Sequence, residues 1–167
     1  MKRLDNESGK EFSYQADVSV LEHYYQKQFE MIRKGNTDLV SLELVMLGNA
    51  LDFISFVKGS FGISLDGNEK SVFAFEEVLD ALSRGIINKN LFDKQTGIAK
   101  NAGAYLGFLI IANIGGEWAD TNEGKAVIVS GREVYVMDFI NKRLQSGSEL
   151  NAAEYFKAVR TLKGTQP

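Results

Sequence analysis

The hydrophobic pattern is densest between Thr96 and Trp118. Apolar residues recur there at three- and four-residue intervals, and nearly every residue from Ala102 to Ala112 is apolar or glycine. This spacing predicts a central helix that is buried around most of its circumference. Gly103 and Gly107 lie four residues apart on one face, where the missing Cβ lets another part of the chain approach closely. The following Gly115-Gly116 pair is expected to end the helix.

A helical period also runs through most of the chain on either side of this segment. It predicts helices over residues 17–34, 38–58, 71–84, 89–94, 138–144 and 151–162. The expected N-caps are Asp17, Thr37 or Asp38, and Ser71 or its alternative Asn68, because their side chains accept hydrogen bonds from the free N–H groups of a first turn. Arg84-Gly85 is expected to close the third of these helices.

After Gly116 the hydrophobic period falls from about 3.6 to 2, as in β-strands. Three short strands are predicted at residues 117–120, 125–129 and 133–136, and glycine-containing turns separate them. The predicted fold is therefore α+β, a mainly helical layer with a small three-stranded antiparallel meander near the C-terminus. Residues 1–15 read as a flexible tail, and residues 16–163 as a single domain.

Composition narrows the function classes. The 167 residues include 44% hydrophobic residues and no cysteine, and carry a formal net charge of −3. Without a basic field, binding to nucleic acid is not expected. The N-terminus lacks the apolar segment of a signal peptide, and the apolar run at 102–112 is shorter than the roughly 20 residues of a membrane span. We therefore expect a cytoplasmic protein that does not enter the membrane.

Three short motifs carry a family resemblance. They are Leu65-Asp66 with Ser71 and the acidic helix that follows, the Gly-Ala-Tyr-Leu-Gly segment at 103–107, and Gly-Gly-Glu-Trp at 115–118 before the meander. Together they resemble an uncharacterised family of bacterial domains of unknown function, over residues 42–162. Small proteins of this kind often neutralise a partner in toxin systems, so the resemblance implies an immunity-type protein and no catalytic residues.

Candidate catalytic chemistry is sparse. His23 is the only histidine, and the absence of cysteine removes thiolate ligands and nucleophiles, so no metal site, cofactor or catalytic triad is expected. The glycines around 97–103 lack the Lys-Ser/Thr of a phosphate-binding loop. Pairs of carboxylates are the catalytic groups that the sequence does not exclude, because its 22 Asp and Glu residues allow many acid–base pairs.

The first functional hypothesis is a protein-binding domain, most specifically an inhibitor of a toxin or effector. An acidic surface would attract a basic partner. The predicted partner-binding residues are Glu76, Glu77 and Asp80 on the third helix, and Asp120 and Glu123 on the first turn of the meander.

The alternative is a small-molecule-binding domain or small hydrolase, with a carboxylate site in a cleft between the helices and the meander. The pocket candidates are Tyr105, Glu117 and Trp118, and Trp118 is expected to pack where helix and sheet meet. A structural or homo-oligomerising role is the third possibility.

Overall fold

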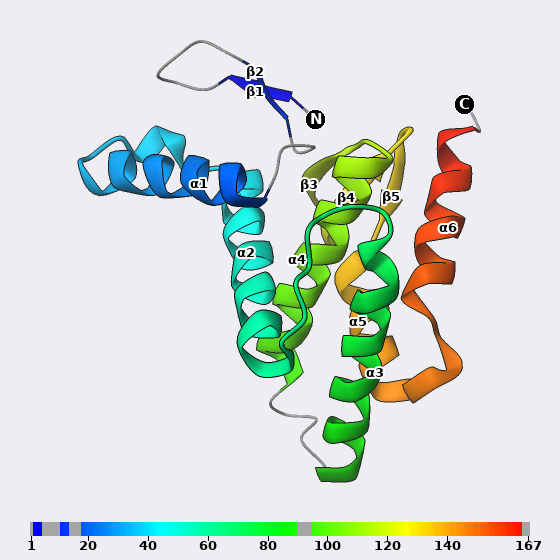
Figure 1. The fold of residues 1–167 in the computed structure, drawn as a ribbon. Coiled ribbons are helices and arrows are strands. Elements are labelled where there is room, and N and C mark those ends of the chain that lie inside the picture. The colour runs from blue at the N-terminus through cyan, green and yellow to red at the C-terminus, as the bar shows by residue number, and fades with distance from the viewer. Residues whose placement is uncertain (1, 5–10, 14–17, 90–94, 165–167) are drawn as a thin grey trace.

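The structure, a computed structural model, describes residues 2–4, 11–13, 18–89 and 95–164 (Figure 1). Its helices are α1 (Val18–Arg33), α2 (Leu42–Phe61), α3 (Ser71–Lys89), α4 (Gln95–Asn113), α5 (Val136–Ser146) and α6 (Ala152–Lys163). Its strands are β1 (Lys2–Leu4), β2 (Glu11–Ser13), β3 (Glu117–Thr121), β4 (Gly124–Val129) and β5 (Arg132–Val134). The predicted α+β fold is confirmed.

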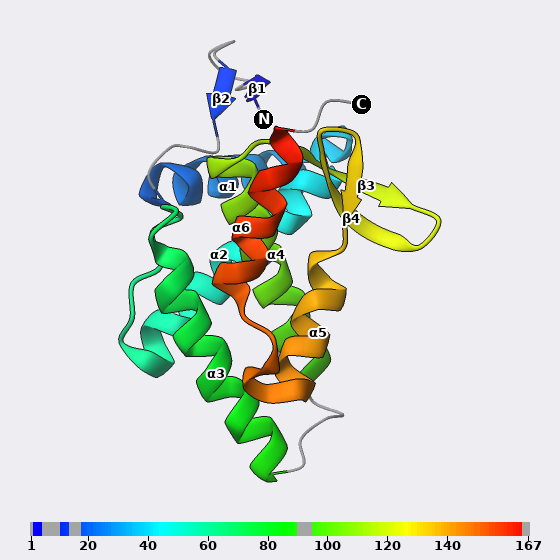
Figure 2. The ribbon, with the colours of Figure 1, turned by 90° about the vertical axis from the view of Figure 1, so that its right-hand side faces the viewer.

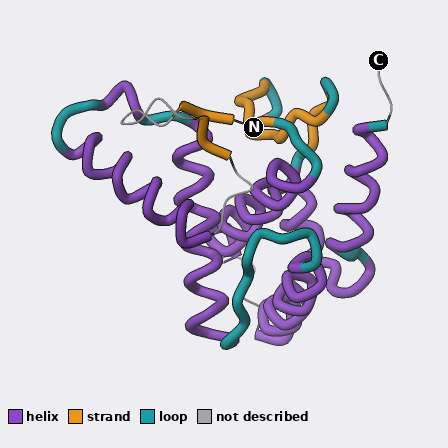
Figure 3. Tube along the Cα trace, turned by 45° about the horizontal axis from the view of Figure 1, so that its top comes forward, coloured by secondary structure: helices purple, strands orange, loops and turns teal. Residues whose placement is uncertain are grey.

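The predicted meander is an antiparallel sheet in the order β3-β4-β5, and it lies along one side of the helices (Figure 3). Trp118 pairs with Val127, which in turn pairs with Val134. A second pairing joins β1 to β2, where the sequence predicted no element. Each of these strands pairs through only three residues, which are too few to show a two-residue hydrophobic period. The hydrogen bonds of the ladder join backbone groups, so they leave no further pattern in the side chains.

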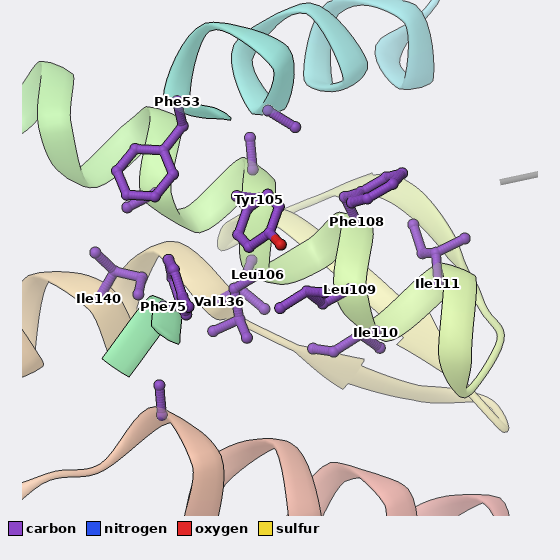
Figure 4. Close-up of a cluster of buried hydrophobic side chains, with 14 of the residues drawn as sticks. Phe53, Phe75, Tyr105, Leu106, Phe108, Leu109, Ile110, Ile111, Val136 and Ile140 are labelled. Atoms are coloured by element: carbon purple, nitrogen blue, oxygen red, sulfur yellow. The ribbon is translucent and has the colours of Figure 1, made fainter. Parts of the chain in front are cut away.

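The core surrounds α4, which packs against α2 on one side and α5 on the other (Figures 1 and 2). Tyr105 lies at its centre, and the Phe53, Phe75 and Phe108 rings have centroids 5.2–6.0 Å from that of Tyr105 (Figure 4). One cluster of buried hydrophobic side chains extends from α1 to α6. The central helix predicted from the apolar run is therefore confirmed.

The close approach predicted at the α4 glycines is confirmed as well. A Cβ at Gly107 would lie 2.2 Å from Cζ2 of Trp118, and one at Gly103 would lie 3.0 Å from Cγ of Met137. Trp118 is only 5% exposed, so its indole fills the space that the missing side chain leaves. This contact joins the sheet to the central helix, as predicted for Trp118.

Two helix boundaries, the start of α2 and the end of α3, differ from the prediction. Ser41, not Thr37 or Asp38, caps α2, because its Oγ accepts a hydrogen bond from the Leu44 N–H at 3.2 Å. Residues 37–39 form the separate 3₁₀ turn η1 (Thr37–Leu39). Gly85 does not end α3, because its φ is not positive and the helix continues to Lys89.

The remaining boundaries are near their predicted positions. Helix α5 begins at Val136, two residues earlier than expected, so β5 ends at Val134 and is shorter. Asn151 caps α6 by accepting a hydrogen bond from the Glu154 N–H at 3.1 Å. The predicted cap at Asp17 and residues 90–94 of the predicted short helix lie outside the described residues.

One described helix, α2, is long and apolar enough, by length and composition alone, to cross a membrane. Half of its most apolar window is buried inside the fold. The buried residues include Met46, Phe53 and Val57, which belong to the hydrophobic core shared with α4. Packing in the core thus accounts for the apolar character of this face of α2.

Candidate functional site

A groove with a volume of about 610 Å³ separates the start of α3 from α6; these two helices run in opposite directions (Figure 2). Val72 and Phe73 of α3 and Ala153 and Phe156 of α6 supply its apolar lining. Phe73 is 65% exposed, the highest fraction among the large hydrophobic side chains that the structure describes. Aromatic side chains are enriched at protein interfaces, so this groove, here called the α3–α6 groove, is the candidate binding site.

Two polar contacts hold the helices that form the groove. At one end, the Glu69 carboxylate pairs with the Arg160 guanidinium at 2.9 Å. At the other end, Glu76 Oε2 accepts a hydrogen bond from the Ala152 N–H, the first of α6, at 2.6 Å. Arg160 also lies over the Phe156 ring, 5.5 Å from its centroid. The groove is therefore preformed, which lowers the ordering cost of binding.

The Arg143 side chain is buried, and each of its three guanidinium nitrogens donates a hydrogen bond. Its Nε donates to Glu76 Oε1 at 2.9 Å, its Nη1 donates to the Gly147 carbonyl, and its Nη2 donates to Glu76 and to Asp80 Oδ1 at 3.3 Å. A buried cation needs such partners because leaving it unpaired is costly. This cluster fixes α5 and the following turn η3 (Gly147–Glu149) against α3.

Two of the predicted partner-binding carboxylates thus have internal roles. Glu76 is half-buried and binds Arg143, and Asp80 pairs with both Arg143 and Arg84. Glu77 is exposed. The three residues do not form one free acidic surface. Glu76 and Asp80 are four residues apart, so both lie on the helix face toward α5, whereas Glu77 lies on another face.

The acidic residues predicted on the first turn of the meander are exposed, but Asp120 belongs to strand β3 and only Glu123 lies on the turn between β3 and β4. Asp120 forms a salt bridge with Lys125 at 3.2 Å. Glu123 lines a second hollow of about 470 Å³, between α2, α4, this turn and the start of α5. Its other lining residues include Val45, Asn49, Lys100, Tyr135 and Asp138.

This second hollow, here called the hairpin cleft, lies between the helices and the first turn of the meander, but other residues line it than those predicted for a cleft there. Tyr135 is its most constrained polar group: its hydroxyl donates to Glu133 Oε2 at 2.5 Å and lies 2.9 Å from Thr121 Oγ1. The hydrogen bond to Glu133 raises the pKa of Tyr135, because the neutral hydroxyl is the donor.

The predicted pocket candidates do not meet around a pocket. Tyr105 is completely buried in the core and Trp118 is packed on Gly107, whereas Glu117 is exposed on β3. None of the three lines either hollow. The apolar bodies of Tyr105 and Trp118 are packed in the core, and a binding role for the three residues stays a prediction.

The Tyr105 hydroxyl instead has a structural role. It lies 2.8 Å from Ser71 Oγ and accepts a hydrogen bond from the Gly67 N–H at 3.3 Å, so the loop before α3 is attached to α4. Ser71, the expected N-cap, is instead the first residue of α3, and its Oγ is in contact with the Tyr105 hydroxyl. Burial raises the pKa of Tyr105 to about 12.

We expect the protein to lose stability between pH 10 and pH 12. In this range Tyr105 of the unfolded chain ionises near the ordinary tyrosine pKa of 10.0, while the folded residue keeps its proton up to about pH 12. The folded state then binds more protons, so the free energy of unfolding falls by about 1 kcal/mol per pH unit from this residue. Burial raises the pKa of Tyr155 to about 12 too, which acts in the same direction.

Urea unfolding at pH 9 and pH 11 measures this effect, with Tyr105→Phe as the comparison. The variant should be less stable at pH 9 by about 1–3 kcal/mol, because the buried Gly67 N–H loses its acceptor. It should also show a smaller difference between the two pH values. An unchanged pH dependence in the variant would contradict the assignment.

Metal-ligating groups are not clustered in the part of the chain that the structure describes: no three His, Cys, Asp or Glu side chains gather there. His23 is exposed on α1.

No protein family model, curated protein or solved structure matches the chain. The resemblance to an uncharacterised family of bacterial domains, and the immunity-type role that it implies, therefore stay predictions.

Sequence reasoning missed two key residues, although each gave a signal. Phe73 lies off the buried stripe of α3, which contains Val72, Phe75 and Val78, so an aromatic ring on the polar face was visible in the sequence. Arg143 shares its helix face with Phe139, Ile140 and Leu144. A charged residue at such a position indicates a buried ion pair.

Proposed function

We propose that this chain is a protein-binding domain, and that the α3–α6 groove is its docking surface. The observation that carries the proposal is the exposed Phe73 ring beside a preformed hollow. An exposed aromatic ring that a partner buries in a desolvated pocket typically becomes one of the few residues that dominate the binding energy. The salt bridge between Glu69 and Arg160 would form part of the polar rim.

The test uses peptides selected from a random peptide library for binding to the wild-type protein. We expect Phe73→Asp to weaken their binding at least about 30-fold, equivalent to roughly 2 kcal/mol or more, because it places a charge in the apolar centre of the interface. Its melting temperature should change little, since the side chain is 65% exposed. Isothermal titration calorimetry measures the affinity.

Phe29→Asp is the matched control. Phe29 is 44% exposed on α1 and does not line the α3–α6 groove, so the same chemical change should leave peptide affinity unaltered. Equal losses in both variants, or the absence of any peptide whose binding depends on Phe73, would contradict the proposed docking surface.

The immunity-type role is the narrower form of this proposal, and its support is the resemblance of the sequence motifs. It predicts that the natural partner is a toxin or effector, bound in a stable complex of fixed stoichiometry. Mixing the purified proteins and measuring the partner's activity tests it, with Phe73→Asp expected to restore that activity.

The hairpin cleft supports a second candidate function, the binding of a small molecule. Its volume of about 470 Å³ is within the usual range of ligand pockets, and it combines apolar Val45 and Met46 with the polar Asn49 and Tyr135. A metabolite that raises the melting temperature of the wild type, but not of a Val45→Arg variant, would favour this function.

A further inference from the structure

The charges around the α3–α6 groove are unevenly distributed along it. Arg160 and Glu69 neutralise one another across the groove. Lys70 and Lys157 also line the groove and are exposed, and neither forms a salt bridge with any residue that the structure describes. These two ammonium groups are therefore available to a partner.

Both lysines lie close in sequence to the Glu69–Arg160 ion pair. Lys70 directly follows Glu69, and Lys157 lies one helical turn before Arg160, the residue that pairs with Glu69. Phe73 follows Lys70 by three residues, so an exposed cation and an exposed ring are neighbours on one side of the groove. Lys157 directly follows Phe156 of the apolar lining on the other helix.

The lining carboxylate outside this ion pair, Glu154, lies toward the other end. It is in the first turn of α6, where the free N–H groups of the helix start stabilise a negative charge. Ala152, two residues before it, contacts Glu76 at that end of the groove. The part of the groove around Phe73, Lys70 and Lys157 is thus apolar and basic.

We infer that the groove takes an acidic amphipathic segment of a partner protein, with an apolar side chain on Phe73 and carboxylates beside Lys70 and Lys157. This inference rests on the proposed docking function and adds the chemistry of the occupant. It differs from the basic partner expected from the sequence, because Glu76 and Asp80 of the predicted acidic surface are paired internally.

The test examines the composition of the peptides selected on the wild-type protein, and their affinity for two charge-reversed variants. Peptides whose binding depends on Phe73 should be enriched in Asp and Glu next to an apolar residue. Lys157→Glu should weaken their binding about threefold to tenfold at low salt, and the effect should vanish in about 1 M salt, where charges are screened beyond about 3 Å.

Lys142→Glu is the matched control, since Lys142 is an exposed lysine on α5 that does not line the groove. Lys70→Glu should repeat the effect of Lys157→Glu. Three results would overturn the inferred occupant. The first is that Phe73-dependent peptides are rich in Lys and Arg, and the second is an equal loss of affinity in the Lys142 and Lys157 variants. The third is a homodimer that Phe73→Asp dissociates. A failure of the docking function itself looks different, because no selected peptide would then depend on Phe73.

Discussion

Replacing Glu76 by Gln should lower the free energy of unfolding by about 3–5 kcal/mol, the usual cost of removing one partner of a buried ion pair. The Arg143 side chain is 1% exposed and would keep its charge without the main counter-ion. A Gln amide also cannot replace both carboxylate oxygens. Glu76 accepts from Arg143 with one oxygen and from the Ala152 N–H with the other, so one of these donors would face an NH₂ group.

Urea unfolding followed by circular dichroism measures this loss, and Glu77→Gln is the matched control. Glu77 is the next residue of α3 and is exposed, so the same chemical change should cost less than about 0.5 kcal/mol. Replacing both partners, as Glu76→Leu with Arg143→Met, should recover much of the lost stability. Similar stabilities of Glu76→Gln and Glu77→Gln would contradict a structural role for the Glu76–Arg143 pair.

Replacing Trp118 by Ala should also cost about 3–5 kcal/mol, because it leaves a cavity between β3 and α4. The indole is 5% exposed and lies against Gly107. Thermal unfolding followed by far-ultraviolet circular dichroism is the suitable measurement, since Trp118 is the only tryptophan and its fluorescence is lost. Glu117→Ala, at the exposed neighbouring position, should change stability little.

The contact itself is tested by combining this change with Gly107→Ala. In the wild-type background the added methyl group would lie 2.2 Å from Trp118 Cζ2 and should cost about 1–3 kcal/mol. With Trp118 replaced by Ala, the methyl group has space and its cost should largely disappear. Additive effects of the two substitutions would mean that they do not act through a shared contact.

The parts of the fold that the sequence predicted are those with strong local patterns. The apolar run and the glycines at 115–116 predicted the position of α4, and the two-residue period of the meander predicted the sheet. The Gly107–Trp118 contact followed because a helical glycine in an apolar segment indicates close packing. By contrast, the β1–β2 pairing has too few residues to show a pattern.

The binding surface was harder to predict, because it depends on contacts between distant residues. Glu76 and Arg143 are 67 residues apart, and only the packing of α5 on α3 brings them together. An acidic helix face therefore looked free in the sequence, although Glu76 and Asp80 are bound to a buried guanidinium. The groove likewise needs α6 beside α3, so Phe73 alone gave only a weak signal.

Mapping a selected peptide by nuclear magnetic resonance tests the docking surface most directly. On addition of the peptide to the labelled 167-residue chain, we expect the amide signals of residues 68–73 and 153–160 to shift, because these segments line the α3–α6 groove. Signals from residues 45–49, 123–125 and 135–138, the segments that line the hairpin cleft, should stay in place. Shifts confined to the cleft residues, with none at the groove, would contradict the account.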